Sequence, residues 1–192
     1  MADVEPQAGR YNWVVAATTR FTIEDFERLP AELAHNHELV DGELVDVSGN
    51  MPAHNFLRDL LVVLLGPHVG ERKLGKIISE QEFKFGDNAH GPDVSLIGPD
   101  KVPSIQRRRV QLFVPDLAIE IVSDNDSFTS LMKKAERYRK CGTREVWVLS
   151  QETREAFVKS DERRALLSDQ DFFESPQISG FQIPLGELFD RA

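Results

Sequence analysis

The residue most informative about chemistry is Glu120, which interrupts the apolar run Leu-Ala-Ile-Glu-Ile-Val at positions 117–122. A run this apolar is typical of a central strand that is covered on both faces. A carboxylate in such a strand must be paired, protonated or bound to a metal ion, because an isolated buried charge is costly. The alternatives to a functional site are a buried ion pair with an arginine and a position at a fraying strand end.

A second acidic residue, Asp93, follows Pro92 and precedes the short run Val-Ser-Leu-Ile. By itself, a Pro-Asp step is more typical of a turn than of a site. Two neighbouring strands could bring Asp93 and Glu120 side by side, and paired carboxylates suit a hard cation such as Mg²⁺ or Mn²⁺ that retains several waters. The two residues therefore predict a divalent metal site.

The third element of such a site would be a lysine. The strand of Glu120 supplies none, because the next residue on the same face is Val122. The following predicted helix, residues 127–140, carries Lys133 and Lys134. At about 100° per residue, Lys134 flanks the apolar stripe of this helix and Lys133 points away from it. Lys134 can therefore bring its ammonium toward the strand ends; the alternative is an ordinary lysine whose stem covers apolar surface.

Three segments carry the signals of helices that could position these residues. Thr22 can cap a short helix that has two acidic residues in its first turn, where negative charge suits the helix dipole. Residues 54–70 have apolar side chains on more than one face, which predicts a helix buried over most of its surface. In residues 127–140, apolar side chains fall at helical spacing and form one stripe.

Strand signals occupy most of the remaining chain. Asp41-Gly42 lies between apolar-rich runs and predicts a hairpin with a two-residue turn of positive φ. The predicted strands are this hairpin over 38–47, then 76–85, 93–97, 117–122, 145–149, 156–159 and 164–167, with a tail over 180–189 that ends in one turn. This order predicts the α/β class, a mixed α+β sheet flanked by helices. We expect residues 1–20 to be an N-terminal arm and residues 21–192 to form a single domain.

Composition limits the class of protein. The 192 residues, 41% hydrophobic and 29% charged, fit one ordinary globular domain. The longest apolar run, 60–65, is far shorter than the roughly 18 residues of a membrane-spanning helix, and no apolar segment near the start indicates a signal peptide. The lone Cys141 cannot form an internal disulfide. A reducing, cytoplasmic location with no membrane partner is therefore expected.

The net charge of −9 is the observation least in line with a nucleic-acid-binding protein, which usually has a basic surface. Two basic clusters exist, over 107–109 and 133–140, and the first is more typical of a solvated loop than of a phosphate contact. Net charge says little about a local face, so nucleic-acid binding stays possible.

Other reactive residues give weak signals. His54, at a helix start, is expected to be a cap-region or surface histidine. A zinc spacing with Cys141 is absent for His35, His37, His68 and His90. Neither a glycine-rich phosphate loop nor a Gly-x-Ser-x-Gly elbow occurs, so nucleotide binding and serine hydrolysis have no support.

Five motifs follow one another along the chain. They are His-Glu-Leu-Val-Asp-Gly-Glu-Leu at 37–44, Pro-Asp-Val-Ser at 92–95, Pro-Asp-Leu-Ala-Ile-Glu-Ile-Val-Ser at 115–123, Lys134-x-x-x-Tyr138, and Gly-Thr-Arg-Glu-Val-Trp-Val-Leu at 142–149. In their order and spacing, these motifs resemble the Uma-two family of "putative restriction endonucleases", which belongs to the PD-(D/E)xK nuclease superfamily. The resemblance runs from about Phe21 to Phe189.

The resemblance implies a restriction-endonuclease-like fold with Asp93 and Glu120 as metal ligands. It also implies a catalytic lysine that has moved from the strand onto the next helix, which matches Lys134. Glu38 matches the acidic residue of the family's hairpin and is expected near the site; the alternative is a surface carboxylate. Two loop positions depart from the family, which usually has Pro-Ser where this chain has Asp124-Asn125, and Asp where this chain has Ser150.

We therefore predict an Mg²⁺- or Mn²⁺-dependent endonuclease that hydrolyses phosphodiester bonds in DNA. The metal, held by Asp93 and Glu120, would polarise a phosphoryl oxygen and lower the pKa of a bound water. Lys134 would orient that water or stabilise developing negative charge, with Glu38 as a further catalytic residue. A homodimer is expected. The alternatives are a catalytically silent module that binds nucleic acid or protein on the same fold, which the charge of −9 favours, and a structural subunit.

Overall fold

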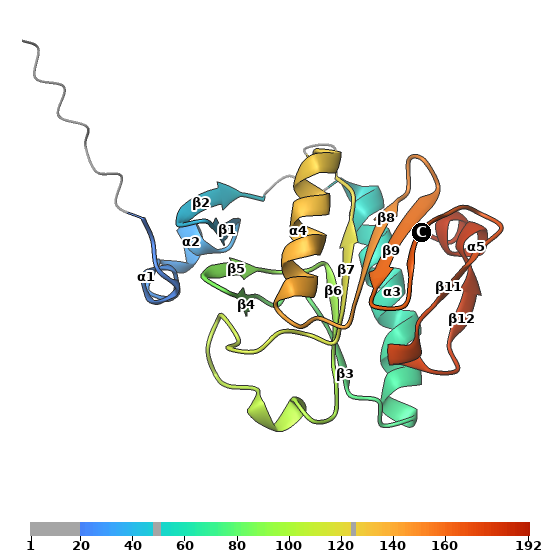
Figure 1. The fold of residues 1–192 in the computed structure, drawn as a ribbon, viewed down its shortest axis with the longest axis horizontal. Helices are drawn as coiled ribbons and strands as arrows, with labels where there is room; N and C mark the ends of the chain where they lie inside the picture. The colour runs from blue at the N-terminus through green and yellow to red at the C-terminus, as the bar shows by residue number, and fades with distance from the viewer. Residues whose placement is uncertain (1–19, 48–50, 124–125) are drawn as a thin grey trace, which may run out of the picture.

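A mixed sheet of six strands forms the centre of the molecule (Figure 1). The computed structural model describes residues 20–47, 51–123 and 126–192, with the backbone alone for residues 32 and 128. The six strands are β3 (Lys76–Ser79), β6 (Val94–Ile97), β7 (Leu117–Ile121), β8 (Glu145–Ser150), β9 (Glu155–Ser160) and β10 (Arg164–Leu167). Their spatial order is β10-β9-β8-β7-β6-β3, in which β7 and β8 are parallel and the other neighbours are antiparallel.

Helices cover both faces of this sheet (Figure 1). On one face, α4 (Phe128–Lys140) packs its apolar stripe, including Leu131 and Tyr138, into a buried cluster. On the other face, α3 (Pro52–Glu71) and α5 (Leu185–Asp190) enclose a larger apolar core. Since successive side chains of a strand point to opposite faces, alternate residues of β7 contribute to the two clusters. This arrangement confirms the predicted α/β class.

A second, antiparallel sheet of four strands lies beside the main sheet, to its left in Figure 1. Its strands are β1 (His37–Val40), β2 (Glu43–Asp46), β4 (Phe83–Phe85) and β5 (Asn88–His90), in the order β2-β1-β5-β4. The β1–β2 hairpin turns at Asp41 and Gly42, whose φ angles of 51° and 86° are both positive, as a two-residue turn of type I′ requires. The predicted hairpin is thus confirmed.

Short elements complete the chain. They are α1 (Ile23–Glu27), α2 (Ala31–Ala34), the 3₁₀ turns η1 (Val102–Ser104) and η2 (Pro176–Ile178), and the strand pair β11 (Phe172–Glu174) and β12 (Gln182–Pro184). Thr22 caps α1, as predicted. The side chain of Thr22 accepts a hydrogen bond from the backbone N–H of Asp25, and the side chain of Asp25 accepts one from the backbone N–H of Thr22. Within the described ranges, no helix is both long and apolar enough to cross a membrane.

Two predictions about elements are wrong. Residues 76–85 do not form one strand, because Glu80 adopts a φ of 53° that ends β3 and sends β4 to the other sheet. Helix α3 is not buried over most of its surface, since Phe56 and Val63 are 63% and 67% exposed. It packs on the sheet with one face, along which buried residues recur three or four positions apart. Strand β5 was not predicted. The predicted arm, residues 1–20, lies outside the described residues except for Arg20. The two loop positions Asp124 and Asn125 lie outside them altogether.

Candidate functional site

Asp93, directly before strand β6, and Glu120, on the neighbouring strand β7, line the same cavity. β6 and β7 are antiparallel, and the last pair of their register, Val94 opposite Ile119, directly adjoins both acidic residues. The two carboxylates are close enough for the negative charge of Asp93 to raise the pKa of Glu120. Oδ2 of Asp93 also accepts a hydrogen bond of 2.6 Å from the backbone N–H of Ile121. The structure therefore brings together the two acidic residues that the sequence singled out.

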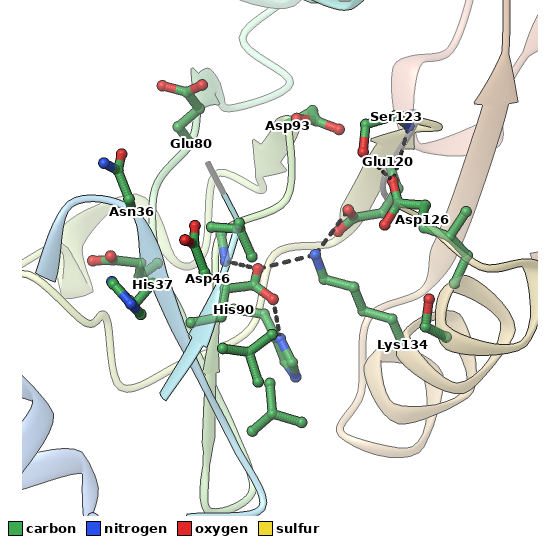
Figure 2. A pocket seen from close by; sticks show the side chains of 18 of the residues that line it. Asn36, His37, Asp46, Glu80, His90, Asp93, Glu120, Ser123, Asp126 and Lys134 are labelled. Carbon is green, nitrogen blue, oxygen red and sulfur yellow. Dashed lines mark hydrogen bonds and ion pairs between the residues drawn. The ribbon is translucent and has the colours of Figure 1, made fainter. Parts of the chain in front are cut away.

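Lys134 reaches from the middle of α4 to two glutamates at once. Its Nζ lies 2.9 Å from Oε1 of Glu38 and 2.9 Å from Oε2 of Glu120. Figure 2 shows the lysine extending from its helix toward Glu120. One turn later, the hydroxyl of Tyr138 donates a hydrogen bond of 2.7 Å to Oε1 of Glu120. Residues four apart share one face of a helix, so α4 presents both groups to the same carboxylate.

Glu38, on β1, is a buried carboxylate whose two oxygens are largely occupied by donors. Oε1 accepts from the backbone N–H of Gly91 at 3.0 Å as well as from Lys134, and Oε2 lies 2.8 Å from Nδ1 of His90. Nη1 of Arg137 lies 3.0 Å from Nε2 of the same histidine. An arginine can only donate, so Nε2 accepts and Nδ1 carries the proton that His90 donates to Glu38. His90 is thus neutral, in line with the burial that lowers its pKa.

The pKa values of the two glutamates move in opposite directions. Burial alone would raise the pKa of Glu38, but the charge of Lys134 and the hydrogen bond from His90 outweigh it and lower the pKa to about 2. Burial raises the pKa of Glu120 to about 8; Lys134 opposes this rise, and the negative charges of Asp93 and Glu38 add to it. The site therefore contains more negative charge than its lysine neutralises, which favours the binding of a proton or a cation.

His54, in the first turn of α3, lies against Asp93. Its Nε2 is 3.2 Å from Oδ1 of Asp93, and the residue is 5% exposed. Burial lowers the pKa of His54, but the hydrogen bond and the charge of Asp93 outweigh it and raise the pKa. The expectation of a cap-region or surface histidine was right about the helix start and wrong about the surface. The missed signal is helical spacing, since His54 continues the buried row of Leu57 and Leu61 toward the N-terminus.

Apart from Tyr138, these side chains line a cavity of about 1090 Å³ between the β1–β2 hairpin, the end of the main sheet and α4. Its acidic lining residues are Glu38, Asp41, Asp46, Glu80, Glu82, Asp93, Glu120 and Asp126. They outnumber the lysines and arginines of the lining, which are Arg109, Lys133, Lys134 and Arg137. A cavity of this charge attracts cations and repels a bare phosphodiester, so a nucleic-acid backbone would have to approach it together with bound cations.

Several arginines of the two basic clusters form ion pairs with acidic residues of the same chain. Arg108 pairs with Glu27, and Arg109 pairs with Glu82. The interpretation of residues 107–109 as a solvated loop therefore holds only in part. On α4, Arg137 pairs with the hairpin residue Asp41, which connects the helix to the small sheet.

The donor set fits a hard divalent cation. Carboxylate oxygens of Asp93 and Glu120 are the ligands that Mg²⁺ and Mn²⁺ prefer, and the surplus of negative charge supplies the attraction. Mg²⁺ is usually held by one or two carboxylates, with waters and substrate phosphates in the other positions. The described part of the chain contains no ready-made group of three or more His, Cys, Asp or Glu ligands, so two carboxylates are the donors that the main sheet provides.

Comparisons with known proteins place the chain among nuclease-like proteins. The family model Uma2, described as "Putative restriction endonuclease", matches residues 23–186. A crystal structure described as "a putative nuclease belonging to DUF820" from Anabaena variabilis has a TM-score of 0.79 and 22% identity, covering 89% of this chain and 98% of that chain. At this identity the likeness shows the fold, which is the predicted restriction-endonuclease-like one. No curated protein matches the sequence.

Proposed function

Because this chain belongs to the Uma2 family of nuclease-like proteins, we propose that it is a metal-dependent endonuclease that hydrolyses phosphodiester bonds in DNA. The observation that carries the proposal is Glu120, a glutamate buried in the central strand β7 that lines an acidic cavity together with Asp93. The family supports the nuclease class. The charge surplus of the site supports the metal requirement.

Asp93 and Glu120 are the proposed ligands of Mg²⁺ or Mn²⁺. An ion bound there would polarise a phosphoryl oxygen and lower the pKa of a bound water. Asp93 is held in place by the N–H of Ile121 at Oδ2 and by His54, whose Nε2 lies 3.2 Å from Oδ1. Glu120 must lose the proton that its raised pKa favours, and Lys134 at 2.9 Å supports the charged form.

Lys134 is the proposed catalytic cation. It lies beside a metal ligand, so its ammonium can orient a water or stabilise the negative charge that develops on the reacting phosphate. Glu38 is proposed as a positioning residue: it stays ionised, with a pKa of about 2, and holds Lys134 through the 2.9 Å ion pair. His90 and Arg137 support Glu38 in turn. This chain of contacts connects the small sheet to the chemistry proposed on the main sheet.

A plasmid-cleavage assay tests the proposal. We expect the purified protein to nick or linearise supercoiled DNA with Mn²⁺ or Mg²⁺ and not with EDTA, and Glu120→Ala to slow cleavage by at least about 100-fold. Glu152→Ala is the matched control, since it removes an exposed carboxylate from the turn after β8. Circular dichroism of both variants checks the fold. Metal-dependent cleavage that persists at the wild-type rate in Glu120→Ala would refute the proposal, and an RNA substrate run in parallel tests the choice of DNA.

A binding module on the same fold is the competing function. The net charge of −9 and the use of Lys134 within the protein favour it. Calorimetric titration with Mg²⁺ separates the two, because a module without a metal site releases no binding heat at millimolar metal. The homodimer and the cytoplasmic location also remain proposals, and light scattering of the purified chain tests the first.

A further inference from the structure

We propose that the outer face of α3 binds a second copy of this chain. This face, which we call the α3 stripe, is formed by Phe56, Leu60, Val63, Pro67 and Gly70. At about 100° per residue, the five positions lie within about 80° of one another around the helix axis. Phe56 and Val63 are 63% and 67% exposed, although both are large apolar residues. Other residues line the cavity of the proposed metal site, so the stripe is a separate feature of the molecule.

The stripe carries no charge. Residues 60–70 contain no Asp, Glu, Lys or Arg, in a chain that is 29% charged. Asp59, which borders the stripe, pairs with Arg58 at 2.9 Å. The outward face of a surface helix is usually polar, and a helix that is apolar all round is usually buried. Two copies of a chain with a net charge of −9 repel each other least where the contact face is uncharged, so the stripe is suited to a second copy.

The order of large and small residues along the stripe also fits a second copy of the same helix. Phe56 and Gly70 lie seven positions before and seven positions after Val63. In a dimer with twofold symmetry, both copies use the same surface patch. Two antiparallel α3 helices that meet at Val63 therefore place Phe56 of each copy over Gly70 of the other. A Cβ atom at Gly70 would meet no atom within 4 Å, so there is open space where the ring would lie.

The size of the stripe predicts a weak dimer. The 20 residues of α3 span about 30 Å, and the exposed part of Phe56 alone offers roughly 100–150 Å². The stripe and its flanks would bury on the order of 500 Å² on each copy, or about 1,000 Å² in total, which is near the lower limit of a specific interface. We therefore expect a dimer that forms as the protein concentration rises, with a Kd on the order of 10 μM.

Sedimentation velocity of the full chain between about 1 and about 300 μM tests the proposal without metal or substrate. We expect the sedimentation coefficient to rise from that of a monomer to that of a dimer. Val63→Lys should weaken dimerisation by at least about 30-fold, because it places two like charges at the centre of an apolar contact. Leu166→Lys is the matched control, since Leu166 is 65% exposed on the edge strand β10 and its variant should dimerise like the wild type.

Cysteine cross-linking tests the geometry of the dimer. In a Cys141→Ser background, Val63→Cys should form a disulfide between copies, because Val63 would lie on the twofold axis. Phe56→Cys and Gly70→Cys proteins should cross-link with each other at least about fivefold more than either does with itself. Thr129→Cys, at an exposed position of α4, is the control and should not cross-link.

A wild type that stays monomeric at about 300 μM would overturn the proposal, because the stripe would then be free or covered by residues of its own chain. Unchanged dimerisation of Val63→Lys would overturn it as well, and its loss in Leu166→Lys alone would place the contact at the edge of the main sheet. The sedimentation of the wild type decides the first question even if a variant fails to fold. Cleavage of DNA is tested by the plasmid assay, so either proposal can fail without the other.

Discussion

Replacing Lys134 with methionine removes the positive charge that two buried glutamates share. Nζ lies 2.9 Å from both Glu38 and Glu120, and methionine keeps much of the apolar stem of the lysine. Removing one partner of a buried ion pair costs about 3–5 kcal/mol. Glu120 limits the loss by holding a proton, because its pKa is already raised to about 8. We therefore expect the lower end of that range, about 3 kcal/mol of unfolding free energy at neutral pH.

Urea unfolding of the metal-free protein measures this loss. In a chain of this size, a loss of about 3 kcal/mol also lowers the midpoint of thermal unfolding by about 6–12 °C. Lys133→Met is the matched control, since the neighbouring lysine is exposed on the same helix and receives the same substitution. We expect it to change the free energy of unfolding by less than about 0.5 kcal/mol.

Equal stabilities of the two variants would refute the reasoning, because the glutamates would then not depend on Lys134. A double-mutant cycle gives an independent check. Glu120→Gln combined with Lys134→Met leaves only Glu38 without its cation, so the two substitutions should not be additive. A coupling free energy below about 0.5 kcal/mol would count against the ion pair as well.

Three further predictions concern the site and its surroundings. The pKa of Glu120 rises from 4.5 to about 8 on folding, so its contribution to the stability of the metal-free protein is complete below about pH 4.5 and is lost as pH rises through about 8. Urea unfolding between these pH values should show that Glu120→Gln reduces the pH dependence of the unfolding free energy. Plots of unfolding free energy against pH that run parallel for the wild type and the variant would contradict this prediction. Tyr138→Phe deletes a 2.7 Å hydrogen bond to Glu120 and should cost about 1–2 kcal/mol in urea unfolding, whereas an unchanged midpoint would mean that the carboxylate does not need the hydroxyl. Gly98→Ala would place its Cβ 2.5 Å from Oδ2 of Asp116 and should lower the unfolding free energy by about 1–3 kcal/mol. Gly66→Ala, on helix α3, would meet no atom within 4 Å and should raise it by up to about 1 kcal/mol. Shifts of the thermal midpoint with the same sign in both variants would contradict this prediction.

Local sequence signals predicted the strand, the helix and the hairpin turn that position the residues of the site. The apolar run around Glu120 predicted a central strand, and the spacing along residues 127–140 predicted the helix that carries Lys134. Asp41-Gly42 predicted the hairpin turn that carries Glu38 into place. These signals were sufficient because periodicity and turn chemistry depend on neighbouring residues, whose preferences the tertiary structure did not override.

Contacts between distant residues were decided only by the tertiary structure. The left-handed backbone at Glu80 divides one predicted strand between two sheets, and the short polar strand β5 exists because it pairs with β1 and β4. Packing of α3 on one side of the sheet turns His54 toward Asp93 rather than toward solvent. His90 becomes a partner of Glu38 across 52 positions of chain. None of these arrangements has a local signature, because each depends on which buried polar groups meet once the two sheets and the helices have packed together.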